Sequence, residues 1–171
     1  MHPYGVLERF GVIILNSGGT FNKRYDPICG KLVVPKDNKA IEEILDSINL
    51  PLPVRGLIYK DSLDMNDADR DELVRAIEET SAKRIVIVHG TDTMDISAAY
   101  VAKHIKNRCI VFTGAMVPYS IDKSEASANL MLAIAKALHF PSEGIYIAMH
   151  GIVEEHTKIH KDRKRGVFCR R

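Results

Sequence analysis

Residues 11–20, Gly11-Val12-Ile13-Ile14-Leu15-Asn16-Ser17-Gly18-Gly19-Thr20, pass directly from an apolar, β-branched run into a polar, glycine-rich turn. Apolar runs without polar alternation are typical of strands that other elements cover on both faces. This succession of an apolar run and a polar segment recurs along the chain. The expected strands are residues 11–15, 54–59, 85–88, 109–112 and 145–149.

Segments with helical periodicity separate these runs. Their apolar residues recur every three to four positions, as expected for helices with one buried face. The four apolar stripes are Ile41, Ile44, Leu45 and Ile48; Leu73, Val74 and Ile77; Met94, Ala98, Val101 and Ile105; and Leu130, Ala133, Ile134, Ala137 and Leu138. We expect Asn66 or Asp67 to cap the second helix and Thr91 or Asp92 to cap the third.

The alternation of strands and helices predicts an α/β fold with right-handed crossovers. We expect a three-layer α/β/α domain with a mainly parallel, flavodoxin-like sheet. Ligands bind outside the carboxyl ends of the strands in such sheets. The segments expected at that edge are residues 16–20, 61–67, 89–93 and 113–120. The sequence therefore predicts a binding site where these four loops converge.

Residues 21–37 form a connection that is too long for an ordinary loop between a strand and a helix. Tyr25, the Asp26-Pro27 pair and Gly30 precede the strand-like residues 31–34. This pattern predicts a hairpin with a mobile tip. Because it follows the first strand, we expect the hairpin to act as a lid over the binding edge.

The composition is that of one soluble globular domain. The chain has 171 residues, 46% of them hydrophobic and 27% charged, with a net charge of +2. We expect a single domain over residues 1–171, with its core at 9–151 and a basic segment at 152–171. A nucleic-acid tail is conceivable there, but the segment lacks interleaved aromatic residues apart from Phe168, and we favour a solvated segment without a nucleic-acid partner.

The cysteines and histidines show no spacing typical of a disulfide framework or a metal site. Cys29, Cys109 and Cys169 are widely separated, and Cys109 falls in an apolar strand, where we expect it to be buried. We therefore expect no metal and no cofactor. The sequence also shows neither a secretory signal nor a membrane-spanning run, which favours a cytoplasmic protein.

The glycine-rich turn and the Thr91-Asp92 pair each have a plain structural interpretation. The glycines could form a tight turn or approach a phosphate, but they are not followed by a nucleotide-binding motif. Thr91 and Asp92 could simply cap a helix. A catalytic threonine needs a base within hydrogen-bond reach, and the candidates are Tyr25 and a lysine. His89 ends a buried strand, where a satisfied structural histidine is the commoner outcome.

Four stretches together resemble the motifs of bacterial-type L-asparaginases, in the order and spacing of that family. They are Leu15-Asn16-Ser17-Gly18-Gly19-Thr20, Asp64-Met65-Asn66-Asp67, Val88-His89-Gly90-Thr91-Asp92-Thr93-Met94 and Thr113-Gly114-Ala115-Met116-Val117-Pro118. The resemblance covers nearly the whole chain. It implies an amide hydrolase that converts L-asparagine to L-aspartate and ammonia through a threonine acyl-enzyme, with weak glutaminase activity.

The resemblance also implies a role for each matching residue. Thr20 corresponds to the nucleophile and Tyr25 to the lid tyrosine that hydrogen-bonds it. Thr91 corresponds to the second catalytic threonine, and Lys161 to its lysine partner, although Lys158 is close by in the sequence. Asp92 is assigned both to the catalytic set and to the substrate, whose α-amino group it holds. The other residues assigned to the substrate are Ser62, which binds the α-carboxylate, and Gly19 and Ala115.

Two departures from the family pattern predict weak substrate binding. Full-length members carry a smaller C-terminal domain that supplies an acidic residue to a neighbouring subunit, and this sequence resembles the short form that consists of the N-terminal domain only. Leu63 also replaces a glutamine that contacts the substrate amine. We therefore expect a high KM with the chemistry intact.

The alternative to an asparaginase is a non-catalytic module of the same fold that binds an amino acid. A third relative, the asparaginase-like subunit of a tRNA amidotransferase, is disfavoured because its extra domains exceed this chain length. By resemblance we expect a homodimer or a higher homo-oligomer.

Overall fold

The computed structural model describes residues 10–171. Two expectations fall outside this range: the start of the core at residue 9, and an N-terminus without a secretory signal. Six strands form one sheet, in the order β4-β1-β5-β6-β7-β8. Their bounds are β1 Val12–Gly18, β4 Val54–Lys60, β5 Arg84–Val88, β6 Cys109–Thr113, β7 Gly144–Met149 and β8 Ile152–Glu155. Neighbouring strands are parallel except β7 and β8, which are antiparallel. The first five strands have the flavodoxin-like order, as predicted.

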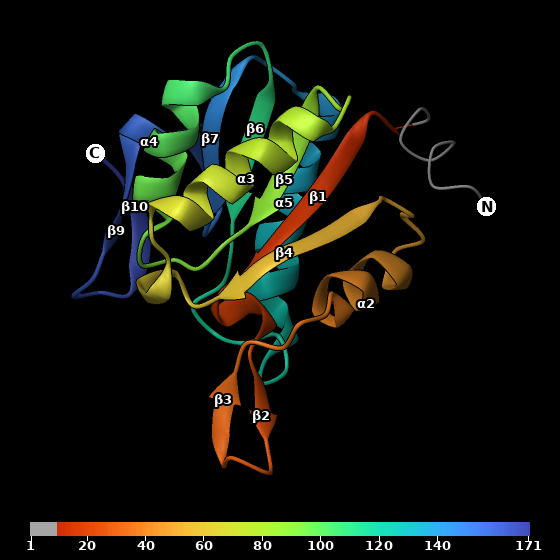
Figure 1. Cartoon of the computed structure of the whole chain (residues 1–171), viewed down its shortest axis with the longest axis vertical. Helices are drawn as coiled ribbons and strands as arrows, with labels where there is room; N and C mark the ends of the chain where they lie inside the picture. Colours follow the sequence, from red (N-terminus) through yellow and green to blue (C-terminus); the bar gives the residue numbers. More distant parts are fainter. Residues whose placement is uncertain (1–9) are drawn as a thin grey trace.

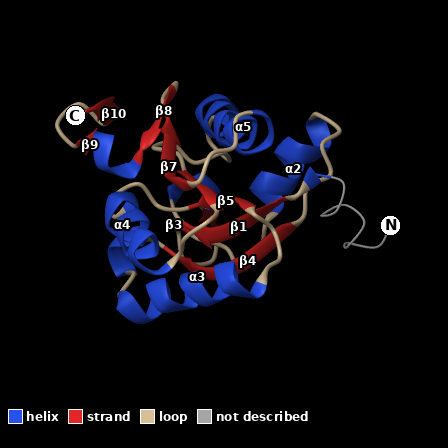
Figure 2. Cartoon of the chain, turned by 90° about the horizontal axis from the view of Figure 1, so that it is seen from above, coloured by secondary structure: helices blue, strands red, loops and turns tan. Residues whose placement is uncertain are grey.

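Helices cover both faces of the sheet, which makes the domain three-layered (Figure 2). Helices α2 (Lys39–Ser47) and α5 (Lys123–His139) lie on one face, and α3 (Asp67–Glu79) and α4 (Met94–His104) lie on the other. Along a strand, side chains alternate between the two cores. In β5, Val86 and Val88 pack towards α2 and α5, whereas Ile85 and Ile87 pack towards α3 and α4. Burial on both faces explains the unbroken apolar runs.

The helix starts agree only partly with the prediction. Asn66, one of the two residues expected to cap this helix, caps α3 and forms a capping box with Asp69. Helix α4 begins later than expected, and its N-cap residue is Thr93 rather than Thr91 or Asp92. The prediction of the cap was wrong because the loop continues for two more residues, and the Thr93 hydroxyl donates to the Ser62 carbonyl at 2.9 Å.

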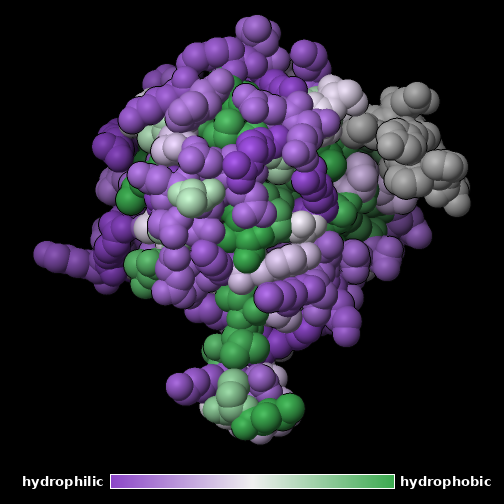
Figure 3. All heavy atoms as spheres, in the orientation of Figure 1, coloured by the Kyte–Doolittle hydropathy of each residue, from purple (hydrophilic) through white to green (hydrophobic). Residues whose placement is uncertain are grey.

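The long connection after β1 forms the predicted hairpin. A short 3-10 helix, Thr20–Asn22, leads into β2 (Arg24–Asp26), which pairs antiparallel with β3 (Lys31–Val33). The hairpin projects from the body of the domain (Figure 1), and apolar side chains gather on it (Figure 3). Ile28, in the turn between β2 and β3, is 95% exposed.

The basic segment 152–171 is folded onto the domain, contrary to the expectation of a solvated segment. It supplies β8 to the main sheet and then a second hairpin, β9 (Ile159–Asp162) and β10 (Val167–Arg170). Ile159 and Phe168 are buried in the core beside α3 and α4, while the basic residues 163–165 are exposed at the hairpin turn. Ile159 and Phe168 anchor the segment to the core. The overall composition of the segment does not reveal this, because it contains more charged residues than apolar ones.

The three cysteines are free thiols, and Cys109 is buried in β6, as predicted. Within residues 10–171, no helix has the combination of length and apolar character needed to cross a membrane.

Candidate active site

The loops after β1, β4 and β5 are in direct contact at the carboxyl edge of the sheet. Ser17 Oγ donates to the carbonyl of Val88 at 2.8 Å, which ties the ends of β1 and β5 together. A methyl group on Gly19 would lie 2.5 Å from the backbone of Gly90, and one on Gly90 would lie 2.6 Å from Ser62. Glycine is therefore required at position 19 by the backbone of Gly90, and at position 90 by the side chain and backbone of Ser62. The site lies between β1 and β5, the topological switch point of this strand order.

Buried asparagines hold the loop after β1 in place. Asn16 and Asn22 exchange amide hydrogen bonds, at 3.2 and 2.9 Å. The side-chain Oδ1 of Asn16 also accepts from Gly18 N, and Asn22 Nδ2 donates to the backbone carbonyl of Gly18 at 2.7 Å. Asn38 Oδ1 accepts from Asn16 Nδ2 at 3.0 Å. These residues were not among the predicted site residues, because their importance comes from contacts across several elements that no local pattern reveals.

Lys161 on β9 reaches the Thr91 loop from the other end of the chain. Its Nζ donates to Thr91 Oγ1 at 3.0 Å and to Asp92 Oδ1 at 2.7 Å. The Lys161 side chain is only 10% exposed. Arg163, from the same hairpin, donates to the Asp92 carbonyl at 2.7 Å. A charged ammonium group is thus placed against a threonine hydroxyl in a largely desolvated position, where its electrostatic effect is stronger than in water.

Lys158 lies away from this group. Its Nζ pairs with Glu155 at 3.1 Å, and its side chain is 61% exposed. Lys158 ends the 3-10 helix His156–Lys158 that precedes β9, whereas Lys161 lies on β9 itself, where alternate residues share a face. Ile159 is buried in the core, and Lys161, two residues later, points to the same side as Ile159. Of the two candidate lysines, the structure brings Lys161 to Thr91.

Thr20 and Tyr25 are not in hydrogen-bond contact in this structure. Thr20 is half-buried at the start of the 3-10 helix. Tyr25 lies on β2 of the projecting hairpin with 65% of its surface exposed. Across residues 10–171, neither hydroxyl has a hydrogen-bond partner, so Thr20 Oγ1 is free for a ligand.

Two other expected substrate-binding residues, Ser62 and Ala115, lie in loops at the same edge. Ser62 is almost fully buried, and its Oγ accepts from Thr93 N at 3.4 Å, at the start of α4. Leu63 follows with 71% exposure. Ala115 is buried in the loop after β6. The side chain of the next residue, Met116, was not predicted as part of the site, but its Sδ lies 3.4 Å from Thr91 Oγ1.

An ion pair joins the base of the projecting hairpin to the loop after β4. Lys23 Nζ and Asp61 Oδ2 are 2.5 Å apart. Burial by itself would raise the pKa of Asp61, but the Lys23 ammonium and the Leu63 N–H together hold that pKa below its ordinary value. Asp61 is therefore an ionised carboxylate beside Ser62.

His89 is a buried, neutral histidine beneath the loops. Burial lowers its pKa from 6.5 to about 4, and its Nδ1 lies 2.7 Å from the Gly90 carbonyl. Its ring contacts Phe112 edge-on, and its Nε2 has no hydrogen-bond partner in the described part of the chain. The buried, neutral ring agrees with the structural interpretation of His89, but the expected satisfaction of its hydrogen bonds is met at Nδ1 only.

The arrangement combines a free threonine hydroxyl, a threonine bonded to a lysine, and the N-terminus of α4. A helix N-terminus carries a partial positive charge that stabilises a developing oxyanion. A lysine within reach of a hydroxyl can move its proton. Such a set of groups is suited to acyl transfer from an amide or ester. Across residues 10–171, no group of three or more His, Cys, Asp or Glu side chains is placed to hold a metal ion.

Comparison with known proteins agrees with this geometry. The family described as "Asparaginase, N-terminal" matches residues 11–167. A glutamyl-tRNA(Gln) amidotransferase subunit from Nanoarchaeum equitans is 33% identical over 150 residues, which are 84% of this chain and 37% of that protein. The protein of the same name from Methanococcus vannielii is 29% identical and matches 84% of this chain and 35% of its own length.

Solved structures show the same fold. The thermostable L-asparaginase from Thermococcus kodakarensis superposes with a TM-score of 0.79 at 25% identity, over 93% of this chain and 50% of that one. The chain thus spans little more than a third of the curated relatives named above and half of the solved structure. The amidotransferase subunit was disfavoured because of chain length. This chain spans only part of the amidotransferase subunits and only part of the asparaginase, so its length favours neither class.

Proposed function

Because the chain belongs to the asparaginase family, whose N-terminal domain matches residues 11–167, we propose that it is an L-asparaginase that hydrolyses L-asparagine to L-aspartate and ammonia. The contact that carries the proposal is the one between Lys161 Nζ and Thr91 Oγ1, at 3.0 Å. It gives a threonine of the site a proton-transfer partner, which a hydroxyl needs for acyl transfer.

In the proposed reaction, Thr20 Oγ1 attacks the carbon of the side-chain amide to give a tetrahedral intermediate. The hydroxyl proton that Thr20 loses is passed by the Thr91–Lys161 pair to the departing nitrogen, which leaves as ammonia as the C–N bond breaks and the Thr20 ester forms. Water then opens the ester at Thr20 and releases aspartate. Tyr25 contributes when the hairpin moves towards Thr20.

Asp92 and Ser62 are proposed to hold the α-amino and α-carboxylate groups of the substrate, beside Gly19 and Ala115. Asp92 already bonds to Lys161, so a substrate ammonium group shares that carboxylate. Leu63 offers no hydrogen bond to the amine, and its side chain is exposed. We therefore expect a high KM for asparagine and a still weaker reaction with glutamine.

The deciding experiment measures ammonia release from L-asparagine by the purified chain and by its Thr20→Ala variant. Turnover by the wild type and its loss in Thr20→Ala support the proposal. Equal turnover by both proteins would exclude Thr20 as the nucleophile. Stabilisation of the fold by aspartate or asparagine without any ammonia would instead identify a non-catalytic amino-acid-binding module.

A second candidate follows from the relatives named as glutamyl-tRNA(Gln) amidotransferase subunits, one of which is 33% identical to this chain. Here the chain would release ammonia from an amide for transfer to another acceptor. Ammonia release that depends on an added partner or on a tRNA would favour this function. Release from free asparagine by the chain alone favours the asparaginase.

We further propose that the protein works as a homodimer or a higher homo-oligomer in the cytoplasm. The exposed apolar residues of the projecting hairpin, including Ile28 and Leu32, suit contact with another protein surface. Light scattering of the purified chain tests this, and a monomeric, fully active protein would contradict it.

A further inference from the structure

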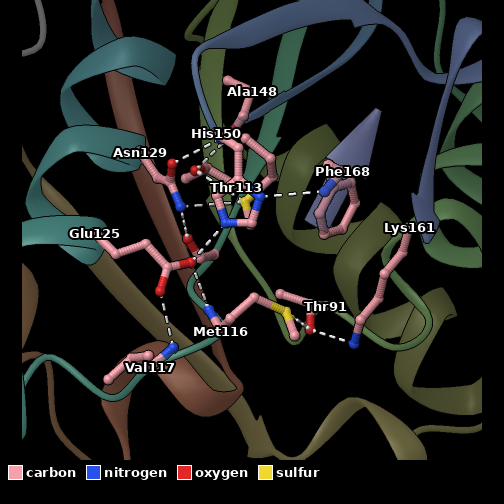
Figure 4. A network of polar contacts seen from close by, with 12 residues as sticks. Thr91, Thr113, Met116, Val117, Glu125, Asn129, Ala148, His150, Lys161 and Phe168 are labelled. Carbon is pink, nitrogen blue, oxygen red and sulfur yellow. Dashed lines mark hydrogen bonds and ion pairs between the residues drawn. The ribbon is translucent and has the colours of Figure 1, made fainter. Parts of the chain in front are cut away.

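Glu125 and His150 lie outside the converging loops and connect the segments that carry Met116 and Lys161, the two side chains in contact with Thr91 Oγ1. Glu125 lies in the first turn of α5, and His150 follows directly after β7 (Figure 4). Glu125 Oε1 and His150 Nε2 are 2.9 Å apart, and both side chains are four-fifths buried, with 21% exposure each.

Glu125 holds the backbone of the loop after β6. Its Oε1 accepts from Met116 N at 2.8 Å, and its Oε2 accepts from Val117 N at 3.0 Å. Met116 is the residue whose sulfur lies 3.4 Å from Thr91 Oγ1. The carboxylate therefore fixes the segment that packs against one side of Thr91.

His150 extends this connection to the hairpin of β9 and β10. Its Nδ1 lies 3.1 Å from the backbone nitrogen of Phe168. Phe168 is the strand partner of Lys161 in the antiparallel pair. The His150 imidazole thus connects Glu125 to β10. β10 pairs with β9, which carries Lys161 on the side of Thr91 opposite Met116 (Figure 4).

The hydrogen bonds fix the proton position on His150. A backbone N–H can only donate, so Nδ1 must accept from Phe168 and carries no proton. The remaining proton is on Nε2, from which it is donated to Glu125 Oε1. Only the neutral Nε2–H tautomer satisfies both bonds, and a second proton on Nδ1 would break the contact with Phe168.

The backbone of His150 is also held in an uncommon conformation. Its φ is +52°, in the left-handed region that non-glycine residues rarely adopt. Asn129 Oδ1 accepts from His150 N at 3.0 Å and stabilises this turn, while Asn129 Nδ2 donates to the carbonyl of Gly114 at 2.9 Å. The surrounding structure thus sets the direction of the imidazole, as is common for residues with a functional constraint.

We propose that Glu125 and His150 are positioning residues for the hydrolysis, which hold Met116 and Lys161 in place on opposite sides of Thr91. The proposal rests on the proposed function. Neither residue is hydrogen-bonded to Thr20, Thr91 or Asp92; their partners are Met116, Val117, Asn129 and Phe168, besides each other. Their effect passes through the Met116 backbone and the Phe168 N–H, so the alignment of Lys161 with Thr91 depends on the tautomer of His150.

The kinetic test compares four variants with the wild type. His150→Leu removes both hydrogen bonds, and His150→Gln keeps one acceptor and one donor. Glu125→Gln turns an NH₂ group towards a backbone N–H of the loop. Glu154→Gln is the matched control, because it neutralises a carboxylate that accepts from Arg170 Nε at 2.7 Å and joins β10 to β8 away from Thr91.

We expect kcat to fall by about 10- to 100-fold in His150→Leu and Glu125→Gln, as for a misplacement of roughly 1 Å, with KM changed by less than about threefold. His150→Gln should recover part of kcat, and Glu154→Gln should retain it. Wild-type kcat in folded Glu125→Gln would overturn the proposal. If His150→Leu does not fold, Glu125→Gln and His150→Gln decide the matter.

A measurement independent of activity separates this proposal from the proposed function. Nitrogen NMR shifts of the His150 ring should show the Nε2–H tautomer, and hydrogen exchange at the Phe168 amide should accelerate in His150→Leu. A wild type without asparaginase activity refutes the proposed function, even when these signals are as expected. An active wild type with the other tautomer, or faster exchange at Phe168 with unchanged kcat, refutes the positioning role.

Discussion

The ammonium nitrogen of Lys161 lies 3.0 Å from Thr91 Oγ1, although the two residues are 70 positions apart in the sequence. The contact is made by the β9–β10 hairpin, whose buried residues Ile159 and Phe168 seat it against the α3 and α4 side of the domain. A segment that looks like a basic tail therefore delivers a residue to the site.

Removal of Lys161 should abolish most of the activity. In Lys161→Met the Thr91 hydroxyl loses its proton-transfer partner, a contribution typically of about 100- to 10,000-fold in kcat. Lys158→Met is the control, because Lys158 pairs with Glu155 and is exposed. Steady-state ammonia release measures both variants. Similar losses in the two, or none in Lys161→Met, would contradict the role of Lys161.

The asparagine network should contribute to stability as well as to the shape of the site. Asn22→Ala removes the hydrogen bonds with Asn16 and Gly18 and leaves buried polar groups without partners. We expect the free energy of unfolding to fall by about 1–3 kcal/mol. Asn38→Ala removes a single side-chain bond to Asn16 and should cost less. Urea unfolding compares the two, and a larger loss in Asn38→Ala would contradict this ranking.

The sheet and the position of the site were predictable because their signals are local. An apolar run predicts a strand buried on both faces, and the polar turn after it falls at the edge where parallel strands end. The hairpin after β1 was predictable for the same reason, since Asp26-Pro27 and Gly30 separate two strand-like segments. These features depend on neighbouring residues only.

The contacts across the site were not predictable, because they join residues that are distant in sequence. The side chain of Glu125 acts on the backbone of Met116, and that of His150 acts on the N–H of Phe168. Neither contact leaves a pattern in the chain. The cap of α4 was misplaced for a related reason: threonine and aspartate favour a cap, but in this loop they face Lys161 instead.

The neutral state of His89 predicts a loss of stability in mild acid. Burial lowers its pKa in the folded protein to about 4, against 6.5 for the ordinary side chain. The unfolded chain therefore takes up the proton first, and stability falls as the pH decreases from about 6.5 to about 4. Fully developed, the loss is about 3 kcal/mol, from about 1.4 kcal/mol per pKa unit.

His89→Gln should reduce this part of the pH dependence, whereas substitution of the exposed His104 should not. Urea unfolding at several pH values measures the difference. NMR titration of wild-type His89 provides a check that does not depend on the variant. A ring that becomes protonated near pH 6.5 in the folded protein would exclude the explanation.

Restoring a polar side chain at position 63 should strengthen substrate binding. Leu63 directly follows Ser62 and is 71% exposed, so glutamine can be introduced there without disturbing the core. A hydrogen bond to a charged group contributes about 1.5–3 kcal/mol when buried and less in an exposed position. We therefore expect KM for asparagine to fall several-fold in Leu63→Gln, with kcat little changed. Leu63→Ala removes the leucine without adding an amide and should leave KM as it is. An equal fall in both variants would mean that the leucine obstructs the site, and no change in Leu63→Gln would mean that weak binding has another cause.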